Sequence, residues 1–187
     1  MKLLSIIQLT VFSIGTIFLI YISRKSLRSF KAHGFYRFFV FEFTLALVLL
    51  NIPYWFTDSF SFPHIVSWIV LCISLLFIIQ SLYFIRKYGG SGKRENYSSN
   101  FEFENTITLV KEGIYKYIRH PMYSSLLFLA WGAALKQITI VNVLLAVLSS
   151  IYIILTARAE EQENIRFFGF GYEEYMKKTK MFIPFII

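Results

Sequence analysis

Long runs of mostly apolar residues, separated by polar segments, dominate the pattern of this chain. Three such runs occupy residues 3–22, 38–56 and 65–85, and each is close to the roughly 20 residues that a helix needs to cross a bilayer. The first lacks a small-residue cleavage site, so it is not expected to be a removable signal peptide. The second ends near Pro53, where a helix should kink or stop. Residues 1–85 are therefore predicted to form an N-terminal region of three transmembrane helices.

The pattern changes after Ile85. Residues 86–120 are polar and contain several glycines, which predicts a loop outside the membrane. Apolar character returns over residues 122–135 and, after a short polar break, over residues 138–157. The first of these runs is short for a full span, so the pair should form a tight helical hairpin with a tilted or partly submerged first arm. From Arg158 a mixed tail, helical in its first part, should lie at the membrane surface.

The distribution of lysine and arginine predicts the orientation. Residues 23–37 hold five of these cations, residues 86–120 hold seven and the tail holds five, whereas the other side holds Lys2 and Lys136. Cations concentrate on the cytoplasmic side of membrane proteins, so the long loop and the C-terminus are expected in the cytoplasm and the N-terminus outside. The predicted fold is all-α: a polytopic membrane protein with about five transmembrane helices, a cytoplasmic loop before the fourth, a cytoplasmic helical tail and no Rossmann domain. The loop, hairpin and tail, residues 86–187, form the second predicted region.

Composition agrees with a membrane protein and excludes other classes. Hydrophobic residues make up 56% of the chain and charged residues 16%, below the roughly 25% of soluble domains. The net charge of +8 is explained by cations at the helix ends, so no nucleic-acid partner is expected. The one cysteine, Cys72, leaves no intrachain disulfide and no cysteine-based zinc site. Glu42 is a carboxylate within the second span, and we expect it to be structural, with Arg37 in reach.

Two polar clusters flank the predicted hairpin. Pro121 favours the first turn of a helix, so His120 should stand at the start of the fourth helix, where the dipole favours an anion such as a carboxylate. Glu160 and Glu161 follow the fifth span, where a carboxylate can hold an ammonium group or ribose hydroxyls. Because the two arms are antiparallel, the clusters should meet at one end and suit a zwitterionic amino acid or nucleoside.

Each cluster alone also fits a plainer role. An Arg-His pair at a helix start is often an interfacial anchor, and paired glutamates are often a solvated helix face. A metal site is not expected, because one nearby histidine and no cysteine make a poor set of ligands.

A longer pattern runs through both clusters. Its residues are Leu109, Val110, Gly113, Tyr115, Arg119, His120, Pro121 and Tyr123, then Glu160 and Glu161, then Phe168, Gly169, Tyr172, Tyr175, Ile183 and Pro184. In order and spacing these residues resemble the isoprenylcysteine carboxyl methyltransferases and their phospholipid N-methyltransferase relatives. Residues 1–85 resemble that family only in being transmembrane helices and carry none of its motif residues.

The resemblance implies an enzyme that uses S-adenosyl-L-methionine and has no Rossmann domain. Its acceptor would be embedded in the membrane, a lipid or prenylated molecule, most like the carboxylate of an isoprenylcysteine. By position, the cofactor contacts would be Asn100, Ile107, Thr108, Leu109, Val110, Tyr115, His120, Pro121, Met122, Tyr123 and Glu160. The catalytic residues would be Arg158 and Glu161, the second of which completes the paired-glutamate motif.

One position departs from the family pattern. An arginine that contacts an acceptor carboxylate is expected four residues before Glu160, where this chain has Thr156. Arg158 is the nearest cation, but it lies about 200° further around a helix, so it takes that place only if the helix has ended. Three alternatives to carboxyl methylation remain open: N-methylation of a phospholipid headgroup, an NADPH-dependent enzyme like the sterol reductases, and a scaffold without catalytic activity.

Overall fold

The computed structural model describes residues 2–30, 32–58, 60–90 and 106–185. Its α-helices are α1 (Lys2–Ser23), α2 (His33–Asn51), α3 (Phe62–Tyr88), α4 (Pro121–Ala134), α5 (Ile140–Phe168) and α6 (Phe170–Lys178). Short 3₁₀ turns cover Ser26–Arg28, Ile52–Tyr54 and Gly113–Lys116. The described ranges contain no strand beyond an isolated bridge between Ile118 and Lys180. The all-α prediction without a Rossmann domain is confirmed.

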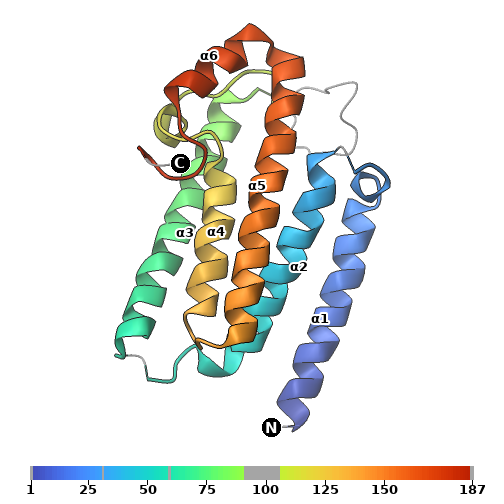
Figure 1. Ribbon diagram of the computed structural model, residues 1–187, viewed down its shortest axis with the longest axis vertical. Helices are drawn as coiled ribbons and strands as arrows, with labels where there is room; N and C mark the ends of the chain where they lie inside the picture. The colour runs from blue at the N-terminus through green and yellow to red at the C-terminus, as the bar shows by residue number, and fades with distance from the viewer. Residues whose placement is uncertain (1, 31, 59, 91–105, 186–187) are drawn as a thin grey trace.

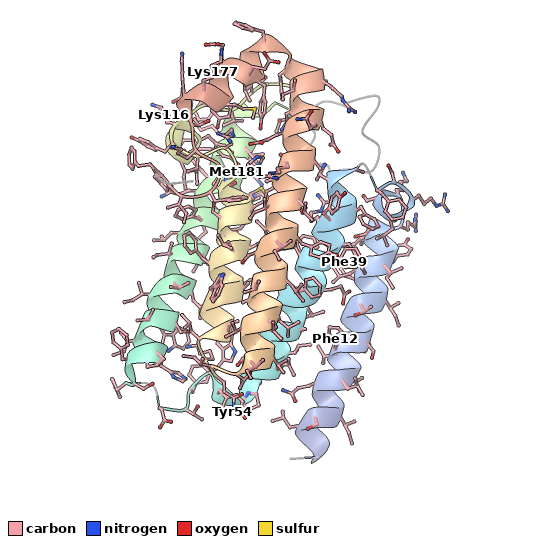
Figure 2. The ribbon with its side chains drawn as sticks, viewed as in Figure 1. Phe12, Phe39, Tyr54, Lys116, Lys177 and Met181 are labelled. Carbon is pink, nitrogen blue, oxygen red and sulfur yellow. The ribbon has the colours of Figure 1, made fainter. Side chains whose placement is uncertain are left out.

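The helices form an elongated bundle with α4 and α5 near its centre (Figure 1). Helix α3 packs against α4, α2 packs against α5 and α4, and α1 packs on the outer side of α2. Helix α6 and the C-terminal segment lie across one end of the bundle, which we call the α6 end. Figure 2 shows Lys116 and Lys177 at this end and Tyr54 at the opposite end.

Small residues bring α3 and α4 into close contact. A Cβ atom at Gly132 would lie 2.8 Å from the side chain of Leu71, so only glycine fits this contact without a shift. The Ser67 hydroxyl donates to the Gly132 carbonyl at 2.6 Å, and Ser74 donates to the Ser125 carbonyl at 2.7 Å. Small residues and hydrogen bonds to the backbone are the usual means of helix association in lipid. They fix the position of α4, which carries the functional site at its start.

Glu42 joins α2 to α1. Its carboxylate Oε2 accepts a hydrogen bond from the Thr16 hydroxyl at 2.9 Å. Arg37, expected as a neighbour of Glu42, instead lies beside His33, with Nη1 3.4 Å from His33 Nε2. The structure therefore gives Glu42 a contact between helices, with a different partner from the one expected.

Among the described residues, four helices are long and apolar enough to cross a membrane: α1, α2, α3 and α5. Helix α4 has 14 residues, so it is the short hairpin arm that the sequence predicts. Its length is about 21 Å, less than the roughly 30 Å hydrocarbon core. The protein is thus a polytopic membrane protein in which α4 is a shorter segment packed among the long helices.

The first part of the tail, predicted to be helical, continues helix α5. The apolar run stops at Ala157, but the helix continues without a break to Phe168. The added residues include Ala, Glu, Gln and Arg, which are good helix formers, so the helix outlasts its hydrophobic pattern. The paired glutamates therefore lie within α5. Because the helix has not ended before Arg158, this residue cannot take the place of the arginine expected at position 156.

Candidate functional site

The start of α4 and the last turns of α5 bring the two polar clusters together. His120 is the N-cap of α4 and Pro121 is its first residue, as expected from the sequence. His120 Nε2 lies 3.3 Å from Glu161 Oε1, and His120 Nδ1 lies 4.0 Å from Glu160 Oε2. The imidazole therefore stands between the two carboxylates, and the predicted meeting of the clusters is present in the structure.

Arg119 connects this group to the C-terminal segment. Its Nε donates to Glu161 Oε1 at 2.7 Å, and its Nη1 donates to the carbonyl oxygens of Met176 and Thr179. The backbone N–H groups of Arg119 and His120 donate to the carbonyls of Lys180 and Met181, so the chain after α6 runs beside the start of α4. Residues from three parts of the sequence are thereby held in one place.

Glu160 is held by side chains on two helices. Tyr123, one turn into α4, donates its hydroxyl to Glu160 Oε2 at 2.5 Å. Asn164, one turn further along α5, donates to Glu160 Oε1 at 3.5 Å. The Glu160 side chain is 28% exposed, whereas that of Glu161 is 7% exposed. Glu160 is therefore the carboxylate of the pair that is open to a ligand and to water.

A cavity lies over these groups. Its lining contains Leu109, Val110, Tyr115, His120, Pro121, Met122, Tyr123 and Glu160, all of which the family resemblance implies as cofactor contacts. It also contains Ile85, Thr106, Arg119, Asn164, Phe168, Tyr172 and Tyr175, which the resemblance did not assign to the cofactor. Asn164 and Phe168 could have been found from the sequence, since they follow Glu160 at four-residue intervals on one face of a continuous helix.

Three implied residues that the structure describes, Ile107, Thr108 and Arg158, lie outside the cavity lining. Ile107 and Thr108 precede the cavity residues in the loop, and the Thr108 N–H donates to the Gly89 carbonyl at the end of α3. Arg158 is exposed on α5 and does not line the cavity. Asn100 lies outside the described residues. The roles of these four residues stay predictions.

Three buried tyrosines form one wall of the cavity. Tyr115 shares a hydrogen bond with Ser81 of α3 at 2.5 Å, and Tyr175 of α6 donates to the Tyr115 carbonyl at 2.7 Å. Burial raises the pKa of Tyr115, Tyr172 and Tyr175 above the usual tyrosine value, so their hydroxyls stay protonated and act as donors.

A glycine allows this wall to approach α3. Gly113 has φ +59°, and a Cβ atom there would lie 2.1 Å from the Phe84 ring. A side chain at this position would therefore strain the backbone and displace the turn that carries Tyr115. Gly113 is therefore needed both for its positive φ and for the close contact with Phe84.

The site suits a zwitterionic organic molecule better than a metal ion. It offers one partly exposed carboxylate, a helix start, tyrosine hydroxyls and apolar walls. Within the described ranges no group of three or more His, Cys, Asp or Glu side chains could hold a metal ion.

Comparisons with known proteins place these features in a family. The model of the phospholipid methyltransferases matches residues 64–169, more than half of the chain. Methanethiol S-methyltransferase of Crocosphaera subtropica is 26% identical over 138 residues, 73% of this chain and 53% of that protein. A probable protein-S-isoprenylcysteine O-methyltransferase of Oryza sativa is 29% identical over 137 residues, 70% of each chain. The chain spans about half the length of the first of these relatives and about a quarter of a similar enzyme from Pseudomonas deceptionensis.

No solved structure matches the chain. The matched region contains nearly all of α3, the loop before α4, α4 and α5, and so it includes both polar clusters of the cavity. The match agrees with the resemblance found in the sequence, and this chain belongs to the phospholipid methyltransferase family.

Proposed function

We propose that this protein transfers a methyl group from S-adenosylmethionine to an acceptor embedded in the membrane. The observation that carries the proposal is the shared cavity of His120 at the start of α4 and Glu160 near the end of α5. The names of the relatives support methyl transfer as the reaction class. The cavity lies at the α6 end, which the cation distribution favours as the cytoplasmic end, where a water-soluble cofactor can enter.

The residues of the cavity fit this cofactor. When bound, S-adenosylmethionine supplies an electrophilic methyl group on a sulfonium. The positive start of α4 at His120 and Pro121 suits its carboxylate, and Glu160 suits its ammonium group or ribose hydroxyls. The aromatic rings of Tyr115, Tyr172 and Phe168 suit an adenosine. Glu161 holds Arg119 and His120 in position for these contacts.

The protein supplies alignment and exclusion of water. Methyl transfer is an in-line displacement, for which positioning of the two reactants accounts for a large part of the rate. Helix α6 contributes the buried Tyr172 and Tyr175 to the cavity lining, and Phe182 of the C-terminal segment packs beside His120, with ring centroids 6.2 Å apart. These elements would separate the reacting groups from bulk water.

The acceptor is proposed to be a lipid or a prenylated molecule that reaches the cavity from the membrane. The isoprenylcysteine carboxylate has the support of relatives named protein-S-isoprenylcysteine O-methyltransferases in Oryza sativa and Xenopus laevis. A thiol has the support of relatives named methanethiol S-methyltransferases. A phospholipid amine has the support of the family description.

Calorimetry with S-adenosylhomocysteine tests the cofactor site. The purified protein should bind S-adenosylhomocysteine, and Glu160→Ala should weaken binding by roughly 10- to 100-fold, since a hydrogen bond to a charged group contributes about 1.5–3 kcal/mol. Glu174→Ala is the matched control, because Glu174 lies on α6 and pairs with the exposed Lys177. Binding of NADPH in place of S-adenosylhomocysteine would indicate a reductase, and binding of neither would contradict the proposal.

A further inference from the structure

We infer that Ser81 of α3 is a positioning residue of the cofactor cavity and that it acts by holding the hydroxyl of Tyr115. The inference rests on the proposed cofactor site and adds to it a residue of a membrane helix that lies outside the sequence motif. It follows from the buried serines of α3 and from the way in which the loop before α4 lies along the end of this helix.

Three serines, Ser67, Ser74 and Ser81, lie on one side of α3. They are seven residues apart, which is nearly two full helical turns, so all three face the same way. Together with His64 they are the buried residues of this helix. Ser67 and Ser74 donate to backbone carbonyls of α4, whereas Ser81 shares its hydrogen bond with the Tyr115 hydroxyl. Ser81 is therefore the serine of this set that bonds a side chain of the cavity lining.

The hydrogen bond between Ser81 and Tyr115 is short and shielded from water. The two hydroxyl oxygens are 2.5 Å apart, and both residues are buried. A buried hydroxyl that loses its partner costs free energy, so neither group turns away easily. The ring of Tyr115 is thus held at its hydroxyl end by α3.

The backbone of Tyr115 is held by other parts of the chain. Its carbonyl oxygen accepts a hydrogen bond from the Tyr175 hydroxyl of α6 at 2.7 Å, and its N–H donates to the Glu112 carbonyl at 3.1 Å. The backbone bonds and the Ser81 bond act at opposite ends of the same side chain. Together they set where the ring lies in the cavity wall.

The loop before α4 follows α3 in the opposite direction. Three contacts join the loop to the last turns of α3, and each later loop residue contacts an earlier helix residue. The pairs are Thr108 with Gly89, Gly113 with Phe84 and Tyr115 with Ser81. Leu109 and Val110, which line the cavity, lie within the segment that these contacts align. Ser81 fixes the end of this segment that is nearest to the start of α4.

Loss of the Ser81 hydroxyl should act on cofactor binding through Tyr115. In Ser81→Ala the phenol keeps its oxygen but loses its buried partner, so the ring is free to move toward another partner. A gap of roughly 0.5–1 Å removes a quarter to a half of the contact energy between two atoms. The displaced ring would therefore make poorer contact with an adenosine.

Calorimetry on the purified full-length protein tests this role with two ligands. These are S-adenosylhomocysteine and 5′-methylthioadenosine, which has the adenosine but no amino-acid group. Ser81→Ala should weaken binding by roughly 3- to 10-fold, the usual contribution of one hydrogen bond. Tyr115→Phe removes the other hydroxyl of the same bond and should give the same fold loss with each ligand. The double variant should bind at most about twofold more weakly than either single variant, because both changes break one bond.

The matched control is Ser67→Ala. Ser67 is buried on the same side of the same helix and donates to the Gly132 carbonyl at 2.6 Å, so its removal costs α3 a bond of the same kind. Both serine variants should lower the midpoint of thermal unfolding, but Ser67→Ala should keep the affinity for both ligands within about twofold of the wild type. Ser81→Thr restores a hydroxyl and should recover most of the affinity that Ser81→Ala loses.

The outcomes separate the inference from the proposed function. Wild-type affinity in Ser81→Ala together with a loss in Tyr115→Phe would mean that the Tyr115 hydroxyl contacts the ligand itself, and this result would overturn the inference. An equal loss in Ser67→Ala would make the effect a general loosening of α3 and would also overturn it. Absence of S-adenosylhomocysteine binding in the wild-type protein would instead contradict the proposed function.

Discussion

At the scale of single residues, Arg119 connects the most parts of the site. Its guanidinium donates to Glu161 on α5, to the Met176 carbonyl in α6 and to the Thr179 carbonyl just after α6. Both side chains of the Arg119–Glu161 pair are at most 10% exposed. Arg119→Gln would leave a buried carboxylate without its cation, so we expect the free energy of unfolding to fall by about 3 kcal/mol. Chemical denaturation in detergent, followed by tryptophan fluorescence, measures this change.

The matched control is the exposed pair on α6. Lys177 Nζ lies 2.6 Å from Glu174, but the Lys177 side chain is 68% exposed. Exposed ion pairs contribute little to stability, so Lys177→Gln should leave the unfolding midpoint unchanged. Equal shifts for Arg119→Gln and Lys177→Gln would contradict the idea that burial makes the Arg119 contact important.

The polar residues of the site were predictable because their positions are unusual for a membrane protein. His120 lies just before one apolar run and the pair Glu160–Glu161 just after the next, and the structure brings them together. The position of Asn164 in the lining depends on α5 continuing beyond its apolar run, which hydropathy does not report. The contact of Arg119 with the C-terminal segment depends on where the chain turns after α6, which local pattern does not specify.

At the scale of helices, buried polar side chains join the start of α2 to the last turns of α5. We call this contact of His33 and Arg37 with Glu163 the α2–α5 junction. Glu163 Oε1 accepts from the His33 backbone N–H at 3.0 Å, and Glu163 Oε2 lies 2.8 Å from His33 Nδ1. Arg37 Nη1 faces the other ring nitrogen of His33 at 3.4 Å. Arg37 therefore donates to Nε2 of a neutral ring, and His33 Nδ1 donates to Glu163. Because Glu163 follows Glu160 by three residues, this junction also positions the cavity side of α5.

Removing the carboxylate tests this junction. Glu163→Ala takes away the acceptor of the first N–H of α2, and a buried group that loses its partner costs about 1–3 kcal/mol. We expect hydrogen exchange in the first turn of α2 to become roughly 5- to 150-fold faster, while the far end of α2 is unchanged. Glu112→Ala is the control, because Glu112 pairs with the exposed Lys116 in the loop. Unchanged exchange at His33 in the Glu163→Ala variant would contradict this account.

Helix ends were harder to predict than helices. The predicted second span began at Phe38, but α2 begins at His33, because its first turn is stabilised by Glu163 from a helix 130 residues away in sequence. Helix α5 extends 11 residues past the end of its apolar run at Ala157, because the residues that follow have high helix propensity. In both cases the hydrophobic pattern marks the part of the helix inside the membrane and not the whole helix.

At the scale of the whole molecule, the position of Lys136 bears on the orientation. It lies in the turn between α4 and α5, away from the other cations. Its side chain is buried, and Nζ lies 3.6 Å from the centre of the Trp68 ring and 5.6 Å from that of Trp55. The aromatic rings stabilise the ammonium group in place of water. A cation on the non-cytoplasmic side is therefore compatible with the proposed orientation.

Cysteine labelling tests this orientation and the contribution of α4. In a Cys72→Ser background, single cysteines replace Ser29 between α1 and α2, Thr57 between α2 and α3, and Ile138 between α4 and α5, and all three positions are exposed. If the α6 end is cytoplasmic and α4 reaches the far side, an impermeant maleimide added to intact cells should label Thr57→Cys and Ile138→Cys. Ser29→Cys should react only after the membrane is permeabilised. If Ile138→Cys reacts only after permeabilisation, as Ser29→Cys is expected to, then α4 returns to the side it came from. If Ser29→Cys is instead labelled in intact cells and Thr57→Cys is not, then the orientation is the reverse of the proposed one.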